Sequence, residues 1–128
     1  MTAATFETAR ATRGSYQALY VLNEGGDKKI RAIVQNILNV LRDPRLEGKL
    51  FVALLAFGDG IELFRLAKPY GPLLERLAGQ GVAFVLCANT LSSREIGPAE
   101  LHPSVQLVPS ANGEIILRQY EGWAVVHP

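Results

Sequence analysis

The sequence has 128 residues, of which 48% are hydrophobic, and its 13 Lys+Arg against 12 Asp+Glu give a formal net charge of +1. A chain of this length suits one domain, which can bury enough surface for a single core without disulfides or structural metals. The near-zero charge, with no long block of like charges, excludes the basic surface needed for nucleic acid and a polybasic membrane anchor.

The cysteine count and the apolar runs indicate the compartment. Cys87 is the only cysteine, which excludes an internal disulfide and a cysteine metal cluster and points to a reducing compartment. The first fourteen residues lack the apolar core of a signal peptide. The longest apolar run, 50–57, is far shorter than the roughly 20 residues that span a bilayer. We expect a cytoplasmic protein without a membrane segment, with an N-terminal extension over 1–14 and one domain over 15–128.

The first half of the chain alternates strand and helix patterns. The apolar run 16–22 ends at the turn sequence 23–26, which predicts a strand followed by a turn. Asp27 is expected to cap a helix, because apolar residues recur three and four positions apart over 30–41. The unbroken apolar run 50–57 is typical of a parallel strand covered on both faces. That strand is therefore predicted to be central.

The second half continues the alternation. Ser92-Ser93-Arg94-Glu95 has the spacing of a capping box and predicts a short helix near residue 93. The other predicted elements are a helical patch at 61–66, a helix opened by Pro72, a strand at 82–86, a strand at 105–108, a helix at 110–120 and a strand at 123–126.

This alternation predicts an α/β fold, a three-layer α/β/α sandwich with about five mostly parallel strands. The aromatic residues at strand positions are expected in the core, namely Tyr16, Tyr20, Phe51, Phe57 and Phe84. Ligands of such sheets meet the loops beyond the carboxyl ends of the strands. The loops selected by this rule are 23–27, 58–60, 87–93 and 109–113.

Cys87 is the strongest candidate for chemistry. It stands at the end of a predicted strand, before a turn that feeds a helix, where free backbone amides favour a thiolate. The alternative is a small buried hydrophobic residue, and no base lies beside Cys87 in the sequence. His102 and His127 each adjoin a proline; we expect both at the surface, and their spacing predicts no metal site.

The remaining candidates are polar or glycine residues in the same loops. The loop 23–27 either presents amides to an anion or is an ordinary turn. Asp59 is either a helix cap or a polar group in the cleft, and Arg94, expected in the first turn of the helix after Cys87, either holds an anion or is solvated. The tentative ligand-binding set is Asn23, Gly25, Gly58, Asp59, Gly60, Asn89, Thr90 and Arg94.

Three segments in order carry a resemblance to a known family. They are Leu-Leu-Ala-Phe-Gly-Asp-Gly-Ile-Glu-Leu-Phe (54 to 64), Gly-Val-Ala-Phe-Val-Leu-Cys-Ala-Asn-Thr-Leu (81 to 91) and Gln-Tyr-Glu-Gly-Trp-Ala (119 to 124). With them, the chain from about Tyr16 to the C-terminus resembles the DsrE/DsrF-like family of small sulfur-relay proteins.

The resemblance implies a flavodoxin-like sandwich without flavin or another cofactor, assembled into trimers or hexamers. It also implies that a cysteine after the third strand accepts sulfur as a persulfide and passes it to a partner protein. Cys87 matches that position. The alternative function is a non-enzymatic oligomeric module that binds a small anionic ligand or regulates a partner.

Overall fold

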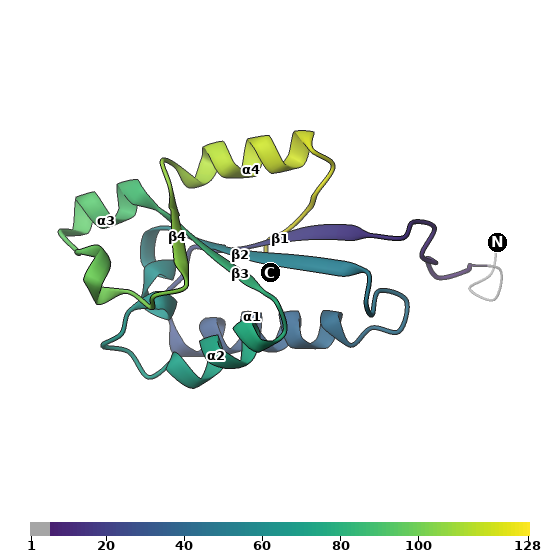
Figure 1. The fold of residues 1–128 in the computed structure, drawn as a ribbon, viewed down its shortest axis with the longest axis horizontal. Coiled ribbons are helices and arrows are strands. Elements are labelled where there is room, and N and C mark those ends of the chain that lie inside the picture. The colour runs from purple at the N-terminus through teal and green to yellow at the C-terminus, as the bar shows by residue number, and fades with distance from the viewer. Residues whose placement is uncertain (1–5) are drawn as a thin grey trace.

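Five strands pair in one parallel sheet, in the order β4-β3-β2-β1-β5, in the computed structural model, which describes residues 6–128 (Figure 1). The strands are β1 (Tyr16–Leu22), β2 (Leu50–Ala56), β3 (Ala83–Cys87), β4 (Val105–Val108) and β5 (Ala124–Val126). The α-helices are α1 (Asp27–Leu41), α2 (Gly71–Gly79), α3 (Ala88–Arg94) and α4 (Ala111–Tyr120), and the 3-10 helices are η2 (Gly58–Phe64) and η3 (Pro98–Glu100). The predicted α/β sandwich is confirmed, with every strand pair parallel.

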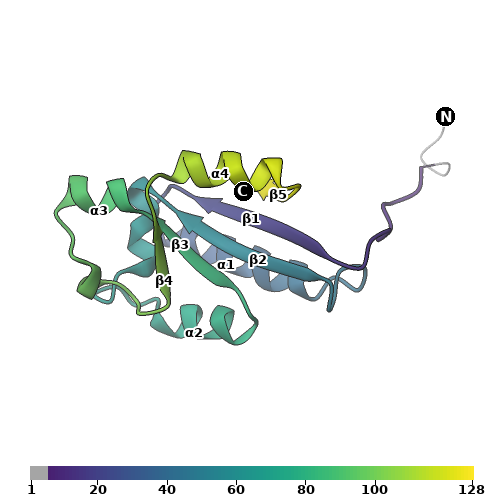
Figure 2. The ribbon, with the colours of Figure 1, turned by 45° about the horizontal axis from the view of Figure 1, so that its top comes forward.

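The direction in which the chain moves across the sheet explains which helices lie on each face. From β1 to β4 the chain moves steadily across the sheet, and right-handed crossovers then place α1 and α2 on one face. The connection from β4 to β5 runs back across the sheet, so α4 lies on the opposite face (Figures 1 and 2). The short helix α3 lies beyond the carboxyl ends of the strands, at the same end as η2. This end is where the predicted loops converge.

The apolar run in β2 occupies the centre of the sheet, as predicted. All seven of its residues pair with β1, from Tyr16↔Leu50 to Leu22↔Ala56, and Ala53 to Ala56 also pair with β3. Side chains alternate between the faces: Leu54 packs in the core beneath α1 and α2, whereas Leu55 packs in the smaller core beneath α4. A strand that is buried on both faces has no polar face, so its sequence does not alternate between apolar and polar residues.

The predicted capping box is wrong, because α3 begins directly after Cys87 and ends where that box was expected to open a helix. Glu95 has a φ of 55°, in the left-handed region, and terminates the helix. Arg94 therefore lies in the last turn of α3, where a cation complements the helix dipole, and not in its first turn.

The starts of two other helices also differ from the prediction. Gly26, and not Asp27, is the N-cap of α1. The Asp27 carboxylate instead accepts hydrogen bonds from the Arg31 guanidinium at 3.0 Å and from the Tyr70 hydroxyl at 2.8 Å. The helical patch predicted from residue 61 is a 3-10 helix that already begins at Gly58.

Three ring side chains lie elsewhere than predicted, while Tyr20 and Phe84 are in the core as expected and Phe57 is partly buried against the smaller core. Tyr16, at the amino-terminal end of β1, is only partly buried and belongs to neither core. Phe51 is 45% exposed, because it lies at the amino-terminal end of β2, where Trp123 contacts it edge-on with ring centroids 5.8 Å apart. His102 is 8% exposed and buried, whereas His127 is at the surface as expected.

Hydrogen bonds hold His102 in the interior. Its backbone N–H donates to the carbonyl of Phe64, which draws the segment after η3 against η2. The Ser104 N–H donates to Nδ1 at 3.2 Å, so the ring proton is on Nε2 and points at the Glu75 carboxylate 2.6 Å away. The Phe84 ring meets the imidazole edge-on at 6.1 Å. Both polar atoms of this buried ring are thus satisfied.

The N-terminal segment 6–15 contains no helix or strand and leads away from the sheet (Figure 2). The Arg45 guanidinium donates to the carbonyl of Ala9, and the Tyr16 hydroxyl accepts from the backbone N–H groups of Thr12 and Arg13. Residues 1–5 of the predicted extension lie outside the described part of the chain. Within residues 6–128, no helix is long and apolar enough to cross a membrane.

Candidate functional site

Cys87 lies where two helices begin. It is the last residue of β3, and α3 starts at the next residue. Cys87 pairs with Val108 at the end of β4, and the chain after β4 enters α4 at Ala111. The amino termini of α3 and α4 are thereby brought to the same end of the sheet, beside a thiol that is 7% exposed.

The polar surroundings of the sulfur favour its ionised form. Burial alone would raise the pKa of the Cys87 thiol. This is outweighed by hydrogen bonds from the backbone N–H groups of Thr90, Ala111 and Asn89 and from the Thr90 hydroxyl, which together lower the pKa of Cys87 below its usual value of 9.0. Such a thiol is a better nucleophile near neutral pH than an ordinary cysteine.

Thr90 connects the sulfur to the loop after β2. Its side chain is 7% exposed, and Oγ1 accepts a hydrogen bond from the Gly58 N–H at 3.0 Å. Since one lone pair of Oγ1 is taken by this amide, the hydroxyl proton is free to point at the sulfur. Gly58 has a φ of 54°, which favours glycine at this turn.

Asp59 and Arg94 form an ion pair between the same two elements, with 2.8 Å between Arg94 Nη2 and Asp59 Oδ1. Asp59 does not cap η2, whose N-cap is Phe57. The two side chains are 70% and 37% exposed, so the pair contributes at most about 1 kcal/mol to stability. The pair joins η2 to α3 at the surface beside the site.

Close backbone packing accounts for two of the predicted glycines. A Cβ added at Gly25 would lie 2.6 Å from the carbonyl oxygen of Asp59, and one at Gly60 would overlap the carbonyl oxygen of Leu22. The loop after β1 therefore packs directly on η2. Asn23 is exposed and its side-chain oxygen accepts from His127 Nε2 at 3.1 Å.

The structure thus brings Gly58, Asn89 and Thr90 together around Cys87, through main-chain and hydroxyl groups. Asp59 and Arg94 lie in the elements that flank it, while Asn23, Gly25 and Gly60 belong to the packing between loops. A ligand-binding role for this set stays a prediction. Within residues 6–128, no group of three or more His, Cys, Asp or Glu side chains is arranged to hold a metal ion.

The sequence interpretation missed one contributor, the backbone amide of Ala111. Ala111 lies in the predicted ligand loop 109–113, but the residue type does not reveal the role of a backbone amide. Ser110 is a sequence signal for this amide, because serine is a common N-cap residue. In the structure, the Ser110 hydroxyl oxygen accepts a hydrogen bond from the Gly113 N–H at 3.0 Å. The amide of the first residue after such a cap is free to meet a sulfur.

The sequence model of the DsrE/DsrF-like family matches residues 2–128, and the chain belongs to that family. The fold is similar to that of MTH1491, a protein of unknown function from Methanobacterium thermoautotrophicum, with 30% identity and a TM-score of 0.84 over 89% of this chain and 100% of that one. The ychN protein of E. coli, 19% identical, shares the fold with a TM-score of 0.65 over 89% and 99% of the two chains. No curated protein matches the chain significantly.

Proposed function

We propose that this DsrE/DsrF-like protein is a sulfur carrier, or sulfurtransferase, that holds sulfur on Cys87 as a persulfide. The observation that carries the proposal is the set of amides and the hydroxyl around the Cys87 sulfur, which lower its pKa. A thiolate, and not a thiol, attacks sulfur. The family supports this reading because its name is associated with sulfur relay.

The reaction is an exchange at sulfur without net oxidation or reduction. The Cys87 thiolate attacks the outer sulfur of a donor persulfide, R–S–SH, and forms a new S–S bond. The S–S bond of the donor breaks, and its thiolate, R–S⁻, leaves. An acceptor thiolate then attacks the outer sulfur of the Cys87 persulfide, which restores the Cys87 thiolate. One cysteine is sufficient for both steps.

The proposal includes two kinds of partner. Donor and acceptor are proteins or small thiols that reach Cys87 at the carboxyl end of the sheet, in the reducing conditions of the cytoplasm.

The second partner is the chain itself, as a trimer or hexamer. Exposed apolar side chains on α4, Ile116, Leu117 and Tyr120, support self-association. Light scattering at micromolar concentration tests it, and a monomer contradicts it.

Loading with sulfur tests the carrier function directly. The protein is incubated with a cysteine desulfurase and cysteine, and its intact mass is measured under non-reducing conditions. We expect the mass of one added sulfur on the wild type, its removal by a reductant, and none on Cys87→Ser. A known carrier in the same tube serves as the positive control. If that carrier is loaded while this protein is not, the proposal is wrong.

A further inference from the structure

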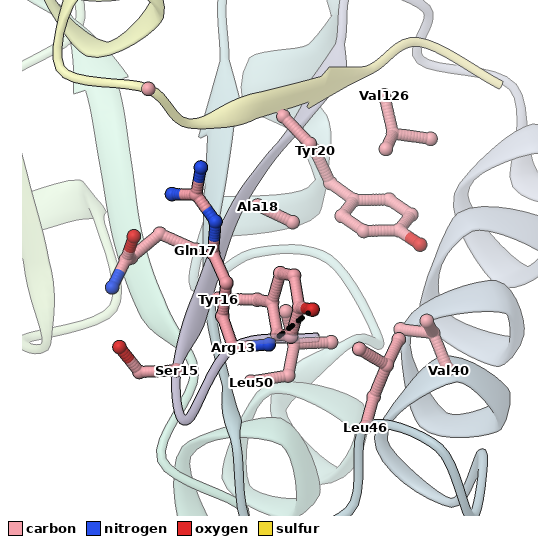
Figure 3. Close-up of a pocket in the computed structure, with 12 residues that line it drawn as sticks. Arg13, Ser15, Tyr16, Gln17, Ala18, Tyr20, Val40, Leu46, Leu50 and Val126 are labelled. Carbon is pink, nitrogen blue, oxygen red and sulfur yellow. Dashed lines mark hydrogen bonds between the residues drawn. The ribbon is translucent and has the colours of Figure 1, made fainter. Parts of the chain in front are cut away.

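A second site lies on the opposite face of the sheet from Cys87. There a cavity of about 440 Å³ opens between the amino-terminal half of β1, the edge strand β5 and the end of α1 (Figure 3). Ala18, Val40, Leu50 and Val126 supply apolar walls. A volume of this size falls in the range of pockets that bind small molecules.

The hydroxyl of Tyr20 is aimed into this cavity. Only 6% of the tyrosine is exposed, and Figure 3 shows the hydroxyl turned into the cavity, away from the strand that carries it. Its oxygen makes no hydrogen bond with any residue in 6–128, whereas the hydroxyls of Tyr16 and Tyr70 are both bonded. Burial raises the pKa of Tyr20, so the hydroxyl keeps its proton and is a donor. The hydroxyl oxygen is not among the buried polar atoms that lack a partner, so it is open to the cavity and can donate to a ligand that supplies an acceptor.

The charge around the cavity selects the kind of ligand. Arg13 is an exposed residue of the cavity lining, and no acidic residue lines the cavity. Among residues 6–128, the Arg13 guanidinium makes no salt bridge, unlike Arg10 beside it in the chain, which pairs with Glu7. A free guanidinium over an apolar cavity is complementary to a carboxylate.

We propose that this cavity binds a small apolar carboxylic acid. Its hydrocarbon part contacts the apolar walls, an oxygen of the ligand accepts a hydrogen bond from the Tyr20 hydroxyl, and Arg13 supplies the positive charge that distinguishes an acid from an alcohol or an amine. The proposal does not depend on sulfur chemistry at Cys87, because it uses the other face and the other end of the sheet.

Three probes of equal chain length test it: octanoate, octanol and octylammonium, each below its micelle concentration. Binding to the full chain is followed by calorimetry and by the backbone amide signals of Ala18, Tyr20 and Val40. We expect saturable binding of octanoate with shifts of these signals, weaker binding of octanol, and none of octylammonium. Equal binding of all three probes, or shifts only elsewhere in the protein, would overturn the proposal.

Two variants separate the contributions. Tyr20→Phe removes only the hydroxyl and should weaken octanoate binding at least roughly tenfold, because a hydrogen bond to a charged group is stronger than one between neutral groups. Arg13→Gln should remove the preference for octanoate over octanol, whereas Arg76→Gln on α2, which does not line the cavity, should leave it unchanged. Unchanged affinity in both site variants contradicts the proposal. So does a response of the cavity signals to protein dilution but not to octanoate, because a second copy would then fill the cavity.

Discussion

Replacing Thr90 with valine keeps the shape of the side chain and removes one hydroxyl. Two hydrogen bonds are lost, one accepted from the Gly58 N–H at 3.0 Å and one donated to the Cys87 sulfur. The part-buried Gly58 amide is left without an acceptor, which costs about 1–3 kcal/mol. The free energy of unfolding of Thr90→Val should fall by about that amount in urea titrations.

The same substitution acts on the thiolate. The hydrogen bond from the Thr90 hydroxyl is one of the contacts that lower the pKa of the Cys87 thiol. The pKa of Cys87 therefore rises in Thr90→Val, and the thiolate fraction near neutral pH falls. The rate of alkylation by iodoacetamide, measured against pH by intact mass, reports this fraction.

Thr8→Val makes the same chemical change on an exposed residue of the N-terminal segment and should leave the alkylation profile unchanged. If the profile of Thr90→Val superimposes on that of the wild type while the protein is folded, the hydroxyl does not stabilise the thiolate. The reasoning from the sulfur's hydrogen bonds would then be refuted.

Further predictions concern stability. The pKa of Cys87 is lower in the folded chain than in the unfolded chain. The wild type should therefore gain stability over Cys87→Ala as pH rises from the folded pKa towards 9.0, and lose that gain as pH falls through the folded pKa. Urea unfolding across this pH range measures the difference in the free energy of unfolding. His102→Leu breaks two hydrogen bonds of a buried ring and should lower the free energy of unfolding by about 1–3 kcal/mol. The exposed control, His127→Leu, should change it by no more than about 0.5 kcal/mol. Equal losses of stability in the two variants would contradict the structural role of the buried His102 ring. Gly60→Ala forces a methyl group into a backbone carbonyl and should lower the melting temperature, with a cost of about 1–3 kcal/mol or more. Gly71→Ala, with open space around it, is the matched control, and a Gly60→Ala protein as stable as this control would contradict the packing argument.

The sequence predicts the sheet well because the central strands β2 and β3 are unbroken apolar runs. The run at 50–57 lacks alternation, and only a central parallel strand buries both faces in this way. The position of Cys87 follows from the same pattern, since the strand before it is apolar up to the cysteine.

Side chains whose surroundings come from distant segments were not predicted. His102 looks like a surface residue beside a proline, but Glu75, 27 positions earlier, meets its ring. The serine and glutamate of the apparent capping box have the right spacing, yet α3 buries only Thr90 and Leu91, too few residues to show a helical period. The residues that line the cavity beside Tyr20 come from β1, β2, β5, α1 and the segments next to them, so no local sequence pattern predicts it.

The pairing of β5 with β1 has a consequence for how the protein is made. Asn23 and His127, 104 residues apart, are hydrogen-bonded where these two strands end, and Ala18 pairs with Ala124. During synthesis, β1 thus keeps one edge unpaired until the C-terminal strand leaves the ribosome. Contacts this distant in sequence slow the final closure. The cavity walls contributed by β1 and β5 are also completed only at that moment, so a ligand bound there would hold the two ends of the chain together and favour the finished fold.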